Sequence, residues 1–236
     1  MKIDPKILNK YLRKVSLGGN IMTLNMNFAE DGMHTKVQEA GNLAMVEGVL
    51  NKDAFEEYES IGEIYIKNSK FLLEMLKTFN EVITIAKEED HIIKLFTDRR
   101  EAYLLLADKS ICDNISENDL PVIATTVSVD LTKTDMEQII KDMRLLEINM
   151  VNIVKEGNKL TFQIGEKNEY DFTKNIVDCE GEGEASVGIG NTIVSFLDAV
   201  SDKFTLKLGT DLPLVLIEET PIMKVTTMIA PIVNDK

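Results

Sequence analysis

Few residues in this 236-residue chain combine the types and the spacing that catalysis needs. The two histidines, His34 and His91, are too few and too scattered for a histidine-rich metal site, and we expect each on a surface strand. Cys112 and Cys179 have no base-bearing motif beside them, so they are interpreted as reduced structural thiols. The phosphate-cradling pattern G-x-x-x-x-G-K-S/T is absent. We therefore expect no enzyme, no catalytic residue, no metal and no cofactor.

Three acidic clusters are the remaining candidates for chemistry. They are Glu56-Glu57, Glu88-Glu89-Asp90 and the stretch from Glu180 to Glu184. None has the ligand spacing of a calcium loop, so they are interpreted as solvated loops. An acidic α+β enzyme is an alternative of a different class, but it would need a nucleophile or metal cluster that the sequence does not offer.

The basic residues near position 10 can do another kind of chemistry, which is contact with phosphate. Lys6, Lys10, Arg13 and Lys14 occur with no acid between residues 5 and 16. On a helix these four side chains lie within about 100° of arc, opposite the apolar positions. Taken alone, such a face is usually just solvated, so its meaning depends on the rest of the chain.

The charge of the whole chain is distributed unevenly. The net charge is −14, from 26 basic and 40 acidic residues, which taken globally opposes binding to nucleic acid. Segments 5–16, 68–79, 133–144 and 191–200 carry +4, +1, 0 and −1. Their total of +4 leaves −18 on the remaining residues. If these segments lie side by side, one layer attracts phosphate while the rest of the surface repels it.

A pattern of helix, strand, tight turn and strand occurs four times. The predicted helices are 6–15, 70–79, 135–144 and 191–200. The predicted strand pairs are 20–27 with 33–39, 82–87 with 91–96, 148–154 with 159–165, and 204–209 with 212–219. Self-similarity of this kind is stronger fold information than any single motif.

The first repeat shows how the helix is specified. Apolar positions 7, 8, 11, 12 and 15 form one helical face, and a shift of 64 residues superposes this segment on the second helix. Asp4 is suited to the N-cap and Pro5 to the first turn. The repeats pair into two halves, which predicts an N-terminal domain at 1–109, a polar connector at 110–124 and a C-terminal domain at 125–236.

No segment resembles a signal peptide, and the longest apolar runs, such as 103–107 and 120–124, are too short to span a bilayer. We therefore expect an intracellular protein that does not bind membranes.

Several stretches carry a resemblance to a known family. These are DLPLVLIEE at 211–219, MIAPIVND at 228–235, and NLAMVEGVL at 42–50 followed by Phe55 and Tyr58. In order and spacing, over nearly the whole chain, the sequence resembles sliding clamps of the proliferating cell nuclear antigen (PCNA) type. The resemblance implies an α+β clamp fold of two similar domains, with helices on one layer and antiparallel sheets on the other.

The resemblance also implies a DNA polymerase processivity factor. Such a factor would lie in the cytoplasm or nucleoid of an archaeon, or in the nucleus for a eukaryotic or viral protein. Three subunits would close into a ring around duplex DNA, as a homotrimer opened by a separate clamp loader. Contacts to phosphate are independent of sequence, which is compatible with sliding. The candidate DNA-binding residues are Lys6, Lys10, Arg13, Lys14, Lys70, Lys77, Lys133, Lys141 and Arg144.

Two further surfaces follow from the resemblance. Replication and repair proteins, including the polymerase, would insert a short helical peptide into a groove. Its expected lining is Gln38, Leu43, Leu120, Pro121, Pro213, Met228, Ile229, Ala230 and Pro231, although Leu43, Pro213 and Ile229 taken singly are also ordinary core or turn residues. Subunits would pair through sheet edges at 101–108 and 170–177, and the expected contacts are Tyr103, Leu104, Leu105, Leu106, Phe172, Lys174 and Ile176.

The chain departs from the family pattern at three places. The fourth helix has Asp198 where a basic residue is usual, the third helix is neutral, and Thr227 and Met228 stand where aromatics are common. These departures leave two alternatives open. One is a subunit of a heteromeric ring of checkpoint or crenarchaeal type, and the other is a viral processivity factor built from the same units.

Overall fold

The computed structural model describes residues 1–112, 120–165 and 171–232, which form two compact units. The N-terminal unit contains Met1–Gly41, Met45–Asp119 and Glu219–Val225. The C-terminal unit contains Asn42–Ala44, Leu120–Glu218 and Thr226–Lys236. The sequence predicted the first domain at 1–109 and the second at 125–236. It did not predict that residues 42–44 belong to the C-terminal unit and residues 219–225 to the N-terminal unit. Within the expected connector, residues 113–119 lie outside the described part, and residues 120–124 belong to the C-terminal unit.

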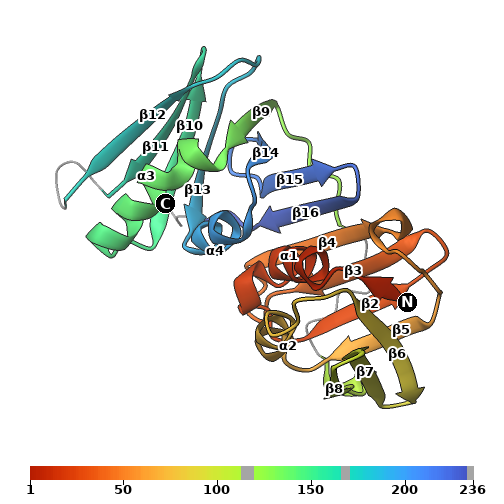
Figure 1. The fold of residues 1–236 in the computed structure, drawn as a ribbon. Coiled ribbons are helices and arrows are strands. Elements are labelled where there is room, and N and C mark those ends of the chain that lie inside the picture. The colour runs from red at the N-terminus through yellow and green to blue at the C-terminus, as the bar shows by residue number, and fades with distance from the viewer. Residues whose placement is uncertain (113–119, 166–170, 233–236) are drawn as a thin grey trace. The chain divides into compact units, whose positions relative to one another are not determined.

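The same element order, one strand, one helix and three strands, occurs four times along the chain (Figure 1). The first repeat has β1(Lys2–Ile3), α1(Pro5–Val15), β2(Leu24–Phe28), β3(Gly32–Gln38) and β4(Ala44–Asn51). The second has β5(Gly62–Ile66), α2(Ser69–Leu76), β6(Ile83–Glu89), β7(Ile92–Thr97) and β8(Arg100–Leu105). The third has β9(Val127–Thr132), α3(Lys133–Leu146), β10(Met150–Glu156), β11(Lys159–Ile164) and β12(Thr173–Asp178). The fourth has β13(Ala185–Gly190), α4(Thr192–Ala199), β14(Lys203–Leu208), β15(Leu214–Thr220) and β16(Met223–Ile229).

Each repeat gives its leading strand to the sheet of its neighbour. In the N-terminal unit, β5 of the second repeat pairs with β2 and β1 of the first pairs with β6. In the C-terminal unit, β13 pairs with β10 and β9 pairs with β14. The resulting strand orders are β5-β2-β3-β4, β1-β6-β7-β8, β12-β11-β10-β13 and β16-β15-β14-β9. Because neither repeat of a pair can complete its sheet alone, two repeats are needed to make one compact unit.

Helix α1 shows how the sequence specifies an element. The Asp4 carboxylate accepts a hydrogen bond from the Lys6 backbone N–H at 2.7 Å, and Pro5 occupies the first turn, as predicted. Leu8, Leu12 and Val15 are buried on one face of the helix. Removing this apolar stripe from water stabilises the packing of α1 on its sheet.

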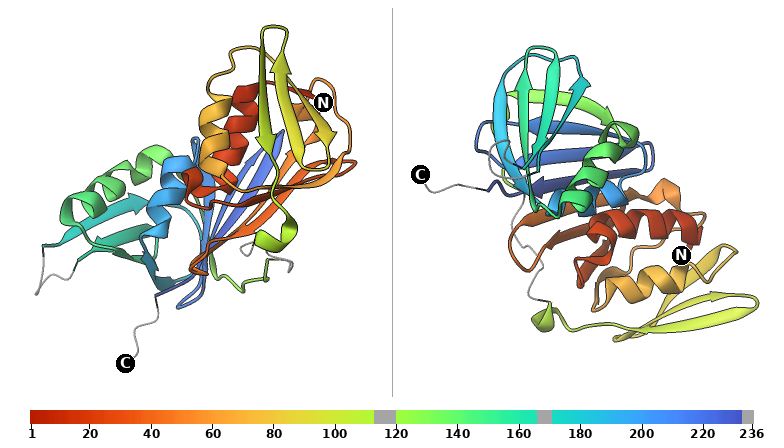
Figure 2. Two further views of the ribbon diagram at one scale, coloured as in Figure 1. Left: turned by 90° about the horizontal axis from the view of Figure 1, so that it is seen from below. Right: turned by 90° about the vertical axis from the view of Figure 1, so that its left-hand side faces the viewer.

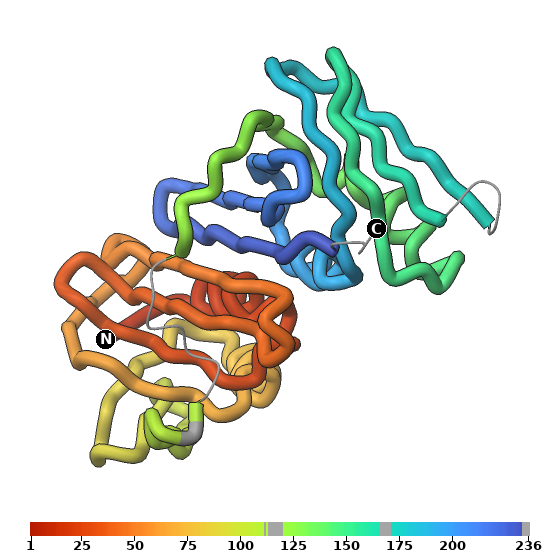
Figure 3. The backbone as a smooth tube through the Cα atoms, turned by 180° about the vertical axis from the view of Figure 1, so that it is seen from behind, coloured from red at the N-terminus to blue at the C-terminus, as the bar shows by residue number. Residues whose placement is uncertain are grey.

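The two helices of the N-terminal unit, α1 and α2, lie side by side on one face of its sheets (Figures 1 and 2). The Asn9 amide donates a hydrogen bond to the Leu73 carbonyl at 2.7 Å, which joins them directly. From behind, the strands of β3 and β4 pass in front of α1 (Figure 3). Within each unit, helices form one layer and antiparallel sheets the other, so the predicted fold class is confirmed.

Gly48 on β4 permits a close approach of α1. A Cβ atom at this position would lie 2.5 Å from Val15 Cγ1 and 2.9 Å from the Tyr11 hydroxyl. Both distances are shorter than real carbon contacts, so only glycine lets α1 pack at this depth. The absence of a side chain at position 48 therefore allows α1 to pack closely against β4.

Several sequence predictions are corrected in detail. The strand expected at 20–27 begins only at Leu24, because Leu17, Gly18 and Gly19 have positive φ angles of 49°, 73° and 97° and turn the chain away first. His91 lies in the turn between β6 and β7, not on a strand. The pattern also missed the leading strands. β1 has two residues, too few to show a period of two, whereas β9 and β13 have six residues each but pair with strands of the neighbouring repeat.

Candidate nucleic-acid interface

The exposed face of α1 carries three of its four basic side chains. Lys6, Lys10 and Arg13 are exposed, and the residues that share the helix with them on the opposite face are buried. No acidic residue occurs within α1. This face therefore presents a row of cations along one side of an 11-residue helix.

Lys14 differs from its prediction. It retains only 3% of its accessible surface, so its ammonium group does not point into solvent with the other three. Lys14 stands at the end of the cationic arc, next to the apolar stripe, and the sequence pattern alone could not separate a boundary position from an exposed one. We remove Lys14 from the candidate DNA-binding residues.

Helix α2 extends the cationic face of the N-terminal unit. Lys70 and Lys77 are both exposed, and about 100° of rotation per residue places them on the same side of the helix. Glu74 lies between them, and its carboxylate pairs with the Lys77 ammonium at 2.6 Å. The N-terminal cationic face is defined as Lys6, Lys10, Arg13, Lys70 and Lys77. The Glu74 carboxylate lies beside it as the partner of Lys77.

The helices of the C-terminal unit present much less positive charge. Lys133 is half-buried, and its ammonium donates to the Val200 carbonyl at 3.3 Å. The Arg144 guanidinium pairs at 2.5 Å with Asp198 of α4, the residue that departs from the family pattern. Lys141 is exposed. Among the predicted cations of α3, Arg144 is thus neutralised and Lys133 is turned toward a carbonyl group.

Asp142 was counted with the acids of α3, but it is not a surface charge. It is 7% exposed and accepts hydrogen bonds from Gln138 at 2.6 Å and from Asn175 of β12 at 2.8 Å. Burial raises the pKa of its carboxyl, but the hydrogen bonds from Asn175 and Gln138 outweigh burial and keep the pKa below its ordinary value. Asp142 therefore ties α3 to β12.

Comparison with solved structures identifies the arrangement. The scan against protein-family models gives no match, and the search of curated proteins gives none either. Solved structures do match over nearly the whole chain. A PCNA from Entamoeba histolytica has a TM-score of 0.83 at 15% identity, covering 98% of both chains. An A. fulgidus PCNA bound to the C-terminal region of FEN-1 has a TM-score of 0.81 at 18% identity, covering 100% of this chain and 98% of that one.

The fold is that of PCNA. A PCNA2–PCNA3 complex from Sulfolobus tokodaii matches as well, with a TM-score of 0.76 at 17% identity over 98% of this chain and 99% of that chain. At these identities the similarity establishes the architecture. The identity of individual contact residues must come from the chain itself.

The residues expected to line the peptide groove of a PCNA fold are only partly brought together. The Ala230 N–H donates to the Leu43 carbonyl at 2.9 Å, and the Leu43 side chain is 51% exposed. Pro231 forms a bridge with Ile189 of β13. Met228 and Ile229 are 9% and 1% exposed, so they are core residues and do not present side chains to a ligand.

The other expected groove residues have varied surroundings. Gln38 ends β3 and is half-buried, and Pro213 is half-buried between β14 and β15. Leu120 is half-buried and Pro121 is exposed. The grouping of all these residues around one peptide stays a prediction.

The two expected subunit edges are edge strands in the PCNA fold of this chain. β8 ends the order β1-β6-β7-β8, and β12 ends the order β12-β11-β10-β13. Tyr103, Leu105 and Ile176 are 53%, 70% and 51% exposed. Lys174 is exposed, while Leu106 and Phe172 are half-buried. Leu104 was expected at the exposed edge, but it is 7% exposed because alternation along β8 turns it toward the core.

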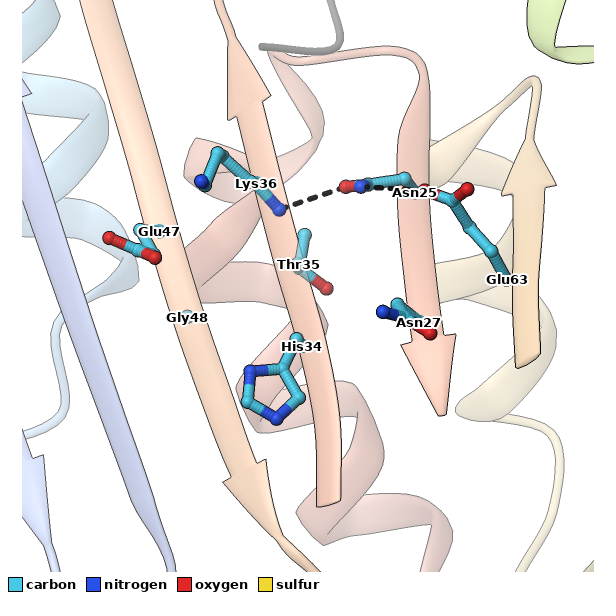
Figure 4. A pocket seen from close by; sticks show the side chains of 8 residues that line it. All are labelled: Asn25, Asn27, His34, Thr35, Lys36, Glu47, Gly48 and Glu63. Atoms are coloured by element: carbon cyan, nitrogen blue, oxygen red, sulfur yellow. Dashed lines mark hydrogen bonds between the residues drawn. The ribbon is translucent and has the colours of Figure 1, made fainter. Parts of the chain in front are cut away.

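A polar cavity of about 250 Å³ on the sheet of the N-terminal unit was not anticipated (Figure 4). It is lined by Asn25, Asn27, His34, Thr35, Lys36, Glu47, Gly48 and Glu63. The Asn25 side chain accepts a hydrogen bond from the Lys36 backbone N–H at 2.8 Å, in place of a strand partner. The lining combines the basic His34 and Lys36 with two glutamates, so its charge favours neither an anionic nor a cationic ligand.

Among the described residues, no group of three or more histidine, cysteine or acidic side chains is placed to hold a metal ion. Within the same residues, no helix is both long and apolar enough to cross a membrane.

Proposed function

We propose that this protein acts as a DNA sliding clamp that encloses duplex DNA as a ring of three copies. The observation that carries the proposal is the N-terminal cationic face on the helix layer of a PCNA fold. Its five side chains are exposed, while the chain as a whole has a net charge of −14. Confining positive charge to one helix layer attracts phosphate there and repels it elsewhere.

Sliding fits this kind of contact. Lysine and arginine bind phosphate without reading bases, so a step along the duplex exchanges equivalent contacts. Enclosure, rather than affinity, would then keep the ring on DNA. The protein would do no chemistry itself and would hold a polymerase and other replication and repair proteins at the template.

The test compares DNA synthesis by a cognate polymerase, with its loader, on circular and linear primed templates. The double variant Lys10→Glu with Arg13→Glu should reduce synthesis on circular DNA at least tenfold, because two charges on one face are reversed and its net charge falls by four units. A matched control, Lys159→Glu with Lys224→Glu, changes the net charge equally at exposed positions on β11 and β16. Equal activity of both double variants would contradict the assignment of α1 to the DNA contact.

Docking of partners through short peptides is part of the same proposal. The A. fulgidus PCNA that shares this fold is bound to the C-terminal region of FEN-1, which supports a peptide mode. Leu43 is an exposed apolar member of the expected groove, so Leu43→Asp should weaken capture of a polymerase C-terminal peptide. Fluorescence anisotropy of a labelled peptide measures this directly.

A second candidate is a subunit of a heteromeric ring. It is favoured by the similarity to a PCNA2–PCNA3 complex and by the neutral helix face of the C-terminal unit. The mass of the isolated protein separates the two candidates. A homotrimer of 26.5 kDa chains has a mass of about 80 kDa, whereas a heteromeric subunit alone would not reach it.

A further inference from the structure

Lys94 stands behind the exposed edge strand of the N-terminal unit. It lies on β7 directly opposite Tyr103 of β8, between the buried residues Ile93 and Leu95. Alternation along the strand therefore turns Lys94 to the outer face of the sheet, the face on which Tyr103 and Leu105 are exposed. Despite this position, the Lys94 side chain is only 16% exposed.

Four side chains surround the Lys94 ammonium. It lies 2.7 Å from the Glu101 carboxylate, 3.6 Å from Glu88, 5.0 Å from the centre of the Phe96 ring and 5.5 Å from that of Tyr103. Two rings and two carboxylates thus hold one cation. The hydrogen bond to Glu101 raises the pKa of Lys94, so the ammonium stays charged at neutral pH.

The cluster also fixes Tyr103. The Tyr103 hydroxyl donates to the Glu101 carboxylate at 2.9 Å, while Lys94 lies over its ring. The Glu101 charge is matched by Lys94 within the same chain. The surface available to a partner is therefore the fixed Tyr103 ring, which is 53% exposed, and the neighbouring Leu105 side chain, which is 70% exposed. Because these side chains are ordered before association, the conformational entropy lost on association is smaller.

The other edge strand has a complementary face. On β12, Lys174, Ile176 and Asp178 are exposed, while Asn175 turns to α3 and bonds Asp142. Ile176 matches the apolar Tyr103 and Leu105, and the aliphatic stem of Lys174 can pack beside the exposed Tyr103 ring. Both strands are six residues long and lie at sheet edges, so β12 of a second copy can extend the sheet that β8 ends.

We propose that Lys94 is a positioning residue that presents Tyr103 and Leu105 on β8 to the β12 strand of a second copy of this chain. The inference rests on the proposed ring and on the subunit edges that the resemblance to PCNA-type clamps implies. The new element is Lys94, which lies outside both strands. Its substitution should weaken the interface between β8 and β12 although Lys94 does not contact the second copy.

The test isolates one joint. A chain with Ile176→Glu keeps a working β8 and is the β8 donor, and a chain with Leu105→Glu keeps a working β12 and is the β12 donor. Mixed, they can form one interface and no ring, and sedimentation velocity gives its dissociation constant. Lys94→Met on the β8 donor should raise this constant at least tenfold, whereas Lys94→Arg should leave it within about threefold.

The same substitution on the β12 donor is the matched control, because there Lys94 lies behind a blocked edge. The inference is overturned if Lys94→Met raises the dissociation constant equally on either donor, or if it has no effect on the β8 donor. Either result leaves the ring proposal standing. Failure of the two donors to associate, in a protein that is itself oligomeric, overturns the choice of strands. An unmodified protein that remains at 26.5 kDa overturns the ring proposal and this inference with it.

Discussion

At the scale of single residues, burial separates side chains that the sequence treats as equals. Lys10 and Lys14 are one helical turn apart in a basic segment, yet one is exposed and the other is 3% exposed. Asp142 and Glu137 both count as acids of α3, but only Asp142 is buried with two amide donors. The formal charge of a segment therefore differs from the charge that its helix presents to solvent.

Asp142→Asn tests the buried carboxylate. An amide at this position offers one acceptor oxygen to two donors, so we expect a loss of about 1–3 kcal/mol of unfolding free energy at neutral pH. Glu137→Gln is the control, because it removes an exposed charge on the same helix and should change stability little. Denaturant unfolding measures both variants.

The pH dependence of that difference has a defined sign. The folded-state pKa of Asp142 lies below its unfolded value, so its contribution is complete above the ordinary value of 3.8 and is lost as pH falls through the folded pKa. Wild type and Asp142→Asn should converge in stability as the solution is acidified below that range. A gap that persists in acid would show that the carboxylate charge is not the cause.

At the scale of elements, close packing decides where helices sit. The α1 helix approaches β4 at Gly48, where a Cβ would lie 2.5 Å from Val15 Cγ1. Gly48→Ala should therefore destabilise the N-terminal unit by about 1–3 kcal/mol, because the helix or the side chains must shift. Gly190→Ala on β13 is the control, since its nearest neighbour would lie at an ordinary 3.7 Å. Thermal unfolding of the two single variants separates the cases.

At the scale of the whole molecule, the exposed edge strand β8 should hold copies of the chain together. We expect the isolated protein to have a mass of about 80 kDa, three times 26.5 kDa, and Leu105→Glu to shift it to a single chain. A charged side chain at an exposed apolar edge position opposes strand pairing between copies. Light scattering after size exclusion gives both masses, and a trimer that survives Leu105→Glu would remove β8 from the interface.

DNA association should also depend on salt. Each cation that neutralises a phosphate releases counterions, so affinity falls as salt rises. The Lys10→Glu and Arg13→Glu double variant should show a shallower decline of affinity with salt than the Lys159→Glu and Lys224→Glu control. Measuring binding to linear duplex across a salt series, without a loader, tests the contact independently of enclosure.

The edge segments came from the resemblance to PCNA-type clamps. The sequence by itself determined the repeated helix and strand pairs, the cap at Asp4 and the cationic face of α1. These features depend on local periodicity and local charge, which a chain carries before it folds. It could not determine the exchange of leading strands β1, β5, β9 and β13, the burial of Lys14 and Leu104, the Arg144–Asp198 pair or the Lys94 cluster. Those depend on contacts between residues far apart in the chain, whose partners only the tertiary structure selects.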